Sequence, residues 1–130
     1  MNGKSQKLNQ VNKKIKFMKW NRLDNQESLD RIIEESQQQA VVIFKHSTSC
    51  SISSMALNRL ERSWNDNEMS EVKAYYLDLI SYRDISNAVA EKFGIMHQSP
   101  QILLIKNGTC VYDDSHMGIN YQSLKSGVAV

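Results

Sequence analysis

Cysteine and proline are scarce in this 130-residue chain, which has two cysteines and one proline. No apolar run approaches the roughly 18–20 residues that a membrane-spanning helix needs, so we expect no membrane partner. The N-terminal lysines are not followed by an apolar segment, which argues against a secretory signal. Two cysteines without such a signal indicate a reducing compartment, most simply the cytoplasm, and argue against a structural disulfide.

Acidic residues are missing from the start of the chain. Residues 1–19 carry six lysines and no Asp or Glu, whereas residues 20–130 carry ten basic and fourteen acidic residues. A basic arm can bind nucleic acid, but this one lacks arginine and has few aromatic residues, so we expect no nucleic-acid partner. We interpret residues 1–17 as a flexible basic N-terminal extension and residues 18–130 as one folded domain.

The stretch that begins at Ala40 is the most informative part of the sequence. Residues 40–44 form an apolar run typical of a strand that is buried on both faces. A polar loop over 45–49 leads to Cys50, after which apolar residues recur at helical spacing as far as Trp64. The pattern predicts a strand, a short loop and a helix whose first turn contains Cys50.

Further elements follow from the same kind of pattern. Asp24 or Asn25 is expected to cap one helix and Ser86 another, with Gly94 ending the second. The segment KNGT between two apolar runs predicts a hairpin turn. The expected strands are 15–20, 72–78, 102–105 and 110–112, and the expected helices are 26–38, 86–93 and 120–126.

The order of these elements is β-α-β-α-β-α-β-β-α. Alternating strands and helices at the front predict parallel strands joined by crossover helices, and the final hairpin adds antiparallel strands. Cys50 follows the second strand, and Pro100 opens the hairpin. This combination predicts a thioredoxin-like α/β fold, with a mixed four- to five-stranded sheet flanked by helices.

Cys50 is the candidate catalytic residue. Free backbone N–H groups and the positive end of the helix dipole stabilise a thiolate at a helix N-terminus, and the thiolate is the nucleophile. The alternative is an inert core cysteine, which fits poorly with its polar neighbours. These neighbours are Ser47, Thr48, Ser49, Ser51 and Ser53.

The motif CSIS places Ser53 where a dithiol motif would have its second cysteine. Cys50 can therefore attack a mixed disulfide and hold the adduct, but no nearby thiol can release it. The Ser53 hydroxyl can donate a hydrogen bond to the thiolate without being oxidised. The motif predicts a monothiol reaction.

Cys110 is expected near the opposite end of the sheet. The strand that begins at Pro100 runs away from Cys50 to the turn at 107–108, and Cys110 follows that turn. At ~3.3 Å per residue, the two cysteines are expected on the order of 20 Å apart. A disulfide needs Cα atoms within about 7 Å, so we interpret Cys110 as an apolar filler.

The topology brings all three histidines, His46, His97 and His116, to the end of the sheet that carries Cys50. A nearby imidazole can stabilise a thiolate or carry a proton, and His116 is the strongest candidate. The alternative is that polar loops hold histidines by chance. The spacing H-x-x-x-C matches no strong zinc pattern, so we predict no metal site.

Three motifs carry a family resemblance: FKHSTSCSIS at 44–53, HQSPQ at 97–101 and DSH at 114–116. Together they resemble the YtxJ-type monothiol bacilliredoxin family of the bacillithiol system, over about residues 18–120. The resemblance implies a thioredoxin-like fold and a cytoplasmic protein. It also implies removal of bacillithiol, a low-molecular-weight thiol, from proteins that carry it as a mixed disulfide.

The resemblance also implies roles for individual residues. Cys50 is the nucleophile, and Pro100 is a cis-proline that presents the backbone of Ser99 to an extended substrate. We expect bacillithiol as co-substrate, no bound cofactor, and as partners bacillithiolated proteins, a free low-molecular-weight thiol and a flavin-dependent reductase. The residues expected to support the thiolate or bind substrate are Ser53, Thr48, His46, Ser99, Pro100 and His116.

Three other functions stay open at this point. Cys50 could form a sulfenic acid, as in a peroxidase or an oxidation sensor. It could hold an iron–sulfur cluster between two chains together with a small thiol, as some monothiol glutaredoxins do. The chain could also be a redox-inert interaction domain, in which alkylation of Cys50 would change nothing.

Overall fold

The structure, a computed structural model, describes residues 18–130. The extension expected at 1–17, and with it the first part of the strand expected at 15–20, lies outside the described residues. The rest of that prediction is wrong: residues 18–20 form no strand, and β1 is the short segment Asn21–Arg22. This strand is only two residues long, and both pair with β3. It is too short to give an alternating pattern in the sequence, which explains why its position was predicted poorly.

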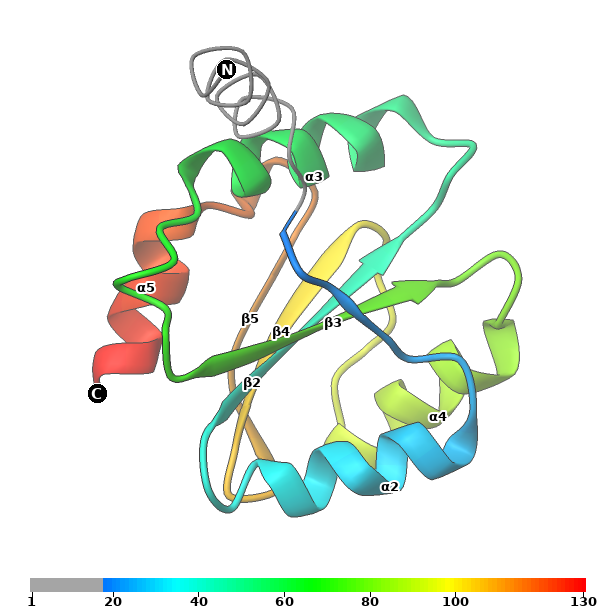
Figure 1. Ribbon diagram of the computed structural model, residues 1–130. Helices are drawn as coiled ribbons and strands as arrows, with labels where there is room; N and C mark the ends of the chain where they lie inside the picture. Colours follow the sequence, from blue (N-terminus) through cyan, green and yellow to red (C-terminus); the bar gives the residue numbers. More distant parts are fainter. Residues whose placement is uncertain (1–17) are drawn as a thin grey trace, which may run out of the picture.

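The longer strands are β2 (Ala40–His46), β3 (Val72–Asp78), β4 (Gln101–Lys106) and β5 (Thr109–Ser115). With β1 they form a five-stranded sheet in the order β1-β3-β2-β4-β5 (Figure 1). Strands β1, β3 and β2 are parallel, whereas β4 is antiparallel to both β2 and β5. The predicted mixed sheet of a thioredoxin-like α/β fold is confirmed.

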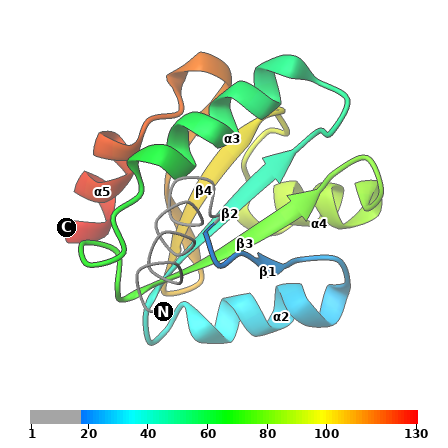
Figure 2. The ribbon, with the colours of Figure 1, turned by 45° about the horizontal axis from the view of Figure 1, so that its top comes forward.

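Helices cover both faces of this sheet (Figure 2). On one face pack α2 (Gln26–Glu35) and α4 (Arg83–Phe93), and on the other pack α3 (Ser51–Ser63) and α5 (Tyr121–Ala129). Successive residues of β2 point alternately into the two cores. Because both cores need apolar side chains, β2 is a continuous apolar run in the sequence. No helix within residues 18–130 is long and apolar enough to cross a bilayer.

Several expected boundaries shift near the site. Strand β2 continues through Lys45 and His46, which are both buried, so the expected loop is shorter. Cys50 is the N-cap of α3 and not a residue of its first turn. The prediction that Ser86 caps α4 is wrong, because the N-cap is Tyr82 and Ser86 is buried within the helix.

Of the other helix ends, two agree with the sequence pattern and two differ from it. The side chain of Asn25 caps α2 by accepting the N–H of Ser28, and Gly94 ends α4 with a left-handed φ of 67°. The first helix stops at Glu35, short of the expected 38, and the last continues to Ala129, beyond the expected 126.

The β4–β5 hairpin is fastened to α2 at the end of the sheet opposite Cys50. Asn107 and Gly108 have φ values of 52° and 75°, as a two-residue hairpin turn with two left-handed residues requires. Ser36 follows α2 and holds this turn: its carbonyl accepts the Asn107 N–H at 2.7 Å, and its hydroxyl accepts the Gly108 N–H at 2.8 Å.

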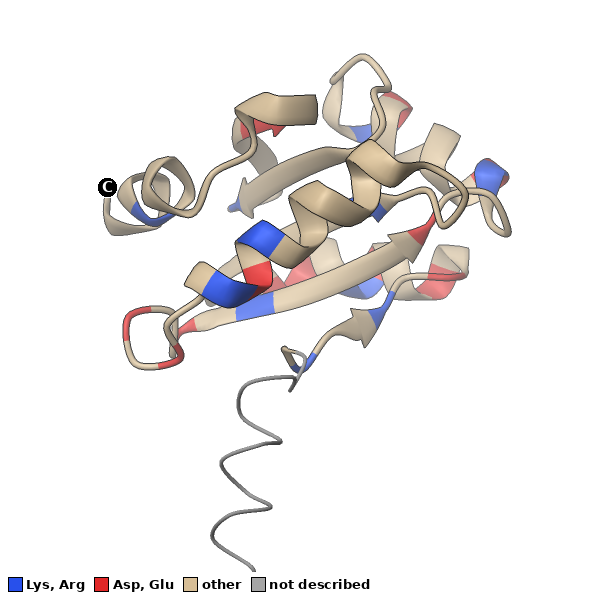
Figure 3. Ribbon diagram, turned by 90° about the horizontal axis from the view of Figure 1, so that it is seen from above, with Lys and Arg blue, Asp and Glu red and all other residues tan. Residues whose placement is uncertain are grey.

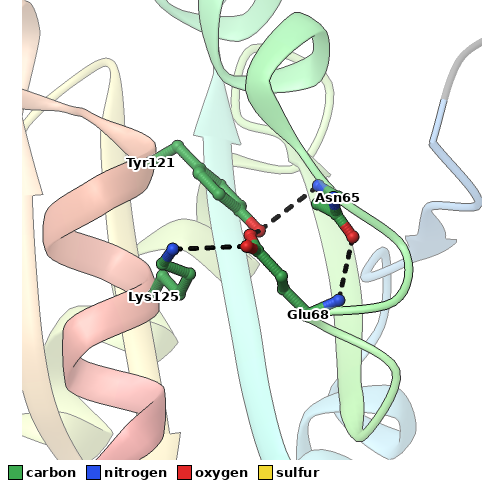
Figure 4. Close-up of polar contacts among 4 residues, drawn as sticks. All are labelled: Asn65, Glu68, Tyr121 and Lys125. Carbon is green, nitrogen blue, oxygen red and sulfur yellow. Dashed lines mark hydrogen bonds and ion pairs between the residues drawn. The ribbon is translucent and has the colours of Figure 1, made fainter.

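Polar contacts also tie the loop between α3 and β3 to α5 (Figure 4). The hydroxyl of Tyr121 donates to Glu68 at 2.7 Å and accepts the Asn65 N–H at 3.3 Å. Lys125 lies 3.4 Å from the same carboxylate. Burial, followed by the hydrogen bond to Glu68, raises the pKa of Tyr121 to about 12. The loop is thereby held against the C-terminal helix.

Candidate active site

Cys50 lies in the turn that joins β2 to α3. Its N–H donates to the Ser47 carbonyl at 3.2 Å, and its own carbonyl accepts the Ser54 N–H at 3.1 Å. The residue is half-buried, and its side chain makes no capping hydrogen bond. An N-cap normally supplies an oxygen that accepts a first-turn N–H. A thiolate at Cys50 can take over that role as acceptor.

Hydrophobic side chains are exposed around this end of the sheet. We call them the apolar rim; they are Ile52, Met55, Ile80, Met96 and Met117. The first two lie in the N-terminal half of α3, where residues 51–58 include no charged side chain; charges appear only further along this helix (Figure 3). The first half of α3 therefore presents an uncharged surface with exposed apolar side chains.

Ser53 is fully buried one turn into α3. Its hydroxyl lies 2.6 Å from His46 Nδ1 and accepts the Ser47 N–H at 3.1 Å. The predicted hydrogen bond from Ser53 to the Cys50 sulfur is not among the hydrogen bonds of residues 18–130. Ser53 instead connects the end of β2 to the helix, and so fixes the loop that carries Cys50.

His46 is buried between β2 and α3, with its ring 5.6 Å from that of Tyr76. Burial lowers the pKa of His46, while the negative charge of Asp78 opposes that shift. The imidazole is therefore favoured in its neutral form, in which Nδ1 can accept the proton of the Ser53 hydroxyl.

Pro100 lies at the same end of the sheet as Cys50. The Ser99–Pro100 peptide bond is cis, as predicted, and Pro100 is buried. Gln101, the next residue, pairs with Lys45 on β2, five residues before Cys50. The Ser99 hydroxyl oxygen is buried and has no hydrogen-bond partner within residues 18–130.

The three histidines all lie toward this end of the sheet, but on different surfaces. His46 faces α3. His97 contacts Lys45 and Ser86 on the face covered by α4. His116 is exposed and has a φ of 55°. No cluster of three or more His, Cys, Asp or Glu side chains suited to a metal occurs within residues 18–130. Thr48 is exposed in the loop.

Cys110 is remote from the site, as expected. It pairs with Ile105, four residues along β4 from Gln101, or roughly 13 Å at the usual rise per residue. Its thiol donates to the Tyr112 carbonyl at 3.3 Å. Burial raises the pKa of Cys110 to about 11, and both cysteines are free.

Sequence reasoning missed the buried polar residues Lys45 and Ser86, which it placed in a loop and at a helix cap. A signal for Lys45 was available, because it continues the alternation of Val41 and Ile43 toward the face covered by α4. No comparable signal existed for Ser86, whose partner His97 comes from a later loop.

The fold and the Cys50 turn together define a thioredoxin-fold protein with a single candidate thiol at the start of a helix. Among solved structures, a thioredoxin-fold protein provisionally described as an oxidoreductase is 30% identical, with a TM-score of 0.68 over 82% of this chain and 90% of that chain. Mitochondrial thioredoxin 3 from Saccharomyces cerevisiae, in its oxidised form, is 19% identical, with a TM-score of 0.63 over 85% and 93% of the two chains. Thioredoxin from Fasciola hepatica is also 19% identical, with a TM-score of 0.63 over 84% and 96%.

Residues 21–124 match the family described as monothiol bacilliredoxin BrxC. The chain therefore belongs to the monothiol bacilliredoxin family. As a member of this family it is a thiol–disulfide oxidoreductase that removes bacillithiol from proteins by thiol–disulfide exchange.

Proposed function

We propose that Cys50 is the nucleophile of this reaction. Its thiolate attacks the bacillithiol sulfur of a bacillithiolated protein. A disulfide forms between Cys50 and bacillithiol, the old disulfide breaks, and the protein cysteine leaves as a thiolate. The N-cap position, where a thiolate can accept first-turn N–H groups, supports this assignment.

The observation that carries the proposal is the separation of the two cysteines. Cys110 is half-buried toward the far end of the sheet, and its raised pKa keeps its thiol protonated near neutral pH. It cannot reach the Cys50 adduct, so a second molecule must release it. A free low-molecular-weight thiol attacks the adduct, leaves with bacillithiol as a new disulfide and restores the Cys50 thiolate.

The surroundings of Cys50 support a protein as the first substrate. The apolar rim offers hydrophobic contact to a polypeptide beside the reacting sulfur. In the proposed complex, the backbone of Ser99 lies along an extended substrate segment, and Pro100, His116 and Thr48 line its path. We further propose that the reaction takes place in the cytoplasm and that a flavin-dependent reductase regenerates the small thiol.

The test is whole-protein mass spectrometry after mixing the chain with a bacillithiolated protein. Wild type and the matched variants Cys50→Ser and Cys110→Ser are compared. We expect wild type and Cys110→Ser to gain the mass of bacillithiol and Cys50→Ser to gain none. Transfer onto Cys50→Ser, or no transfer onto folded and reduced wild type, would contradict the assignment.

A further inference from the structure

Lys45 is a buried charged residue that the proposed reaction does not use. Its side chain is fully buried, on the face of β2 that α4 covers. The ion pairs within residues 18–130 involve Lys73 and Lys125 but not Lys45. Burying an ammonium group without a carboxylate is unfavourable for stability, and a methionine of similar length would avoid that cost. The presence of a lysine at position 45 therefore calls for an explanation other than the stability of the fold.

The contacts of Lys45 lead to one loop. Its ammonium donates to the Ser86 carbonyl of α4 at 3.1 Å and lies 3.3 Å from His97 Nδ1. An ammonium can only donate, so Nδ1 is the acceptor and the proton of the imidazole ring resides on Nε2. The Ser86 hydroxyl lies 3.2 Å from the same nitrogen. His97 is thus held from both β2 and α4.

Gln101, the cross-strand partner of Lys45, holds the same loop from β4. Its side-chain amide donates to the Met96 carbonyl at 3.0 Å and accepts the Gln98 N–H at 3.4 Å. Like Lys45, it is buried. Side chains of β2 and β4 therefore hold three consecutive residues, 96–98. The next two residues in the chain are Ser99 and Pro100.

We propose that Lys45 is a positioning residue for thiol–disulfide exchange: through His97 it fixes loop 95–99 and so places the Ser99 backbone for the protein substrate. This inference rests on the proposed function of Cys50. It assigns the effect to substrate binding and not to the reactivity of the thiol, because Lys45 lies on the face of the sheet opposite α3.

The first test is kinetic and uses Lys45→Met, with Lys106→Met as the matched control. Lys106 also lies on the sheet and donates three hydrogen bonds to the end of α5, but it lies at the far end of β4. We expect Lys45→Met to raise KM for a bacillithiolated protein about tenfold, as a displaced binding element would. In Lys45→Met, iodoacetamide should alkylate Cys50 at the same rate as in wild type. The control Lys106→Met should keep the wild-type KM.

The second test reads the contact directly, by NMR titration of the His97 ring. Burial, Lys45 and Arg83 lower the pKa of His97, in that order. Lys45 acts on it from β2 and Arg83 from α4, and its other polar contact, the Ser86 hydroxyl, is neutral. Lys45→Met removes one cation, so the pKa of His97 is expected to rise.

The results of these tests distinguish a failure of the function proposed for Cys50 from a failure of the positioning role proposed for Lys45. If wild type accepts no bacillithiol, the function proposed for Cys50 fails, whatever the NMR titration shows. If wild type is active and Lys45→Met keeps its KM, or if the His97 titration does not move, the positioning role is overturned. A double variant with His97→Ala should add little to the KM of Lys45→Met, because both substitutions break one chain of contacts.

Discussion

The backbone N–H of His116 donates a hydrogen bond to the carbonyl of Pro100 at 3.0 Å. This bond joins the end of β5 to the start of β4, just where the chain turns into the 3₁₀ helix η1 (His116–Gly118). Arg59 of α3 donates to the carbonyls of Met117 and Ile119. The cis-proline, η1 and the helix that begins after Cys50 are therefore connected by hydrogen bonds, which join three parts of the proposed substrate-binding end.

Replacing Ser53 by alanine is expected to destabilise the fold. The substitution leaves His46 Nδ1 and the Ser47 N–H without their partner in a buried place, at a cost of about 1–3 kcal/mol in the free energy of unfolding. Urea denaturation measures the effect. The neighbouring Ser54→Ala is the control, with an expected change within roughly 0.5 kcal/mol. Equal stability of the two variants would contradict the role given to Ser53.

Replacing Ser99 by alanine should have the opposite effect. The Ser99 hydroxyl oxygen is buried without a partner within residues 18–130, so its removal should raise the free energy of unfolding by roughly 1 kcal/mol. Ser36→Ala serves as a contrast, because the hydroxyl of Ser36 accepts the Gly108 N–H and donates to the Ile33 carbonyl. Thermal denaturation should move the two midpoints in opposite directions; a lower midpoint for Ser99→Ala would mean that the hydroxyl has a partner.

Stability at alkaline pH should show two opposing contributions. Burial lowers the pKa of Lys45 from 10.5 to about 8, so between these values the unfolded chain binds more protons and stability rises with pH. Burial raises the pKa of Cys110 from 9.0 to about 11, so between these values the folded chain binds more protons and stability falls with pH.

Urea denaturation from pH 7.5 upward separates the two contributions. Relative to wild type, Lys45→Met should lose the rise that begins near pH 8, and Cys110→Ala should lose the fall that begins near pH 9. Curves for the variants that run parallel to the wild-type curve at every pH would show that neither group is perturbed in the fold.

Tyr121→Phe should loosen the loop between α3 and β3. The substitution removes the hydrogen bond to Glu68 and leaves the Asn65 N–H unpaired, which should cost about 1 kcal/mol. Amide hydrogen exchange in residues 65–70 should become faster than in wild type. Tyr82→Phe is the control, since the Tyr82 hydroxyl makes no hydrogen bond within residues 18–130. Unchanged exchange in Tyr121→Phe would show that this contact does not hold the loop.

Local patterns were enough to predict most of the fold. The strand over 72–78, the turn at 107–108 and the ends of helices at Asn25 and Gly94 depend on nearby residues, and the structure agrees with each. The same local signals predicted Cys50 at the start of a helix, but they placed it in the first turn, one position inside the N-cap that it occupies. The cis bond before Pro100 came from the family resemblance, and the structure agrees with it.

What escaped prediction depends on contacts between distant segments. Lys45 looked like a loop residue because a charge is rarely buried, yet α4 and the loop at 95–99 supply partners more than forty residues away. Ser86 looked like a cap because hydroxyls favour that position, but its hydroxyl contacts His97 instead. The Ser53 hydroxyl was expected to reach Cys50, and the burial of His46 directs it elsewhere.

The attachment of the hairpin turn to Ser36 has a consequence for how the molecule opens. Ser36 and Gly108 are 72 residues apart in sequence, and the hydrogen bonds of Ser36 to the turn couple the opening of the β4–β5 hairpin to that of the end of α2. Such coupling defines a cooperative unit in native-state exchange. Because β4 begins directly after the cis-proline, the whole length of this strand separates fraying at the remote turn from the end of the sheet that carries Cys50.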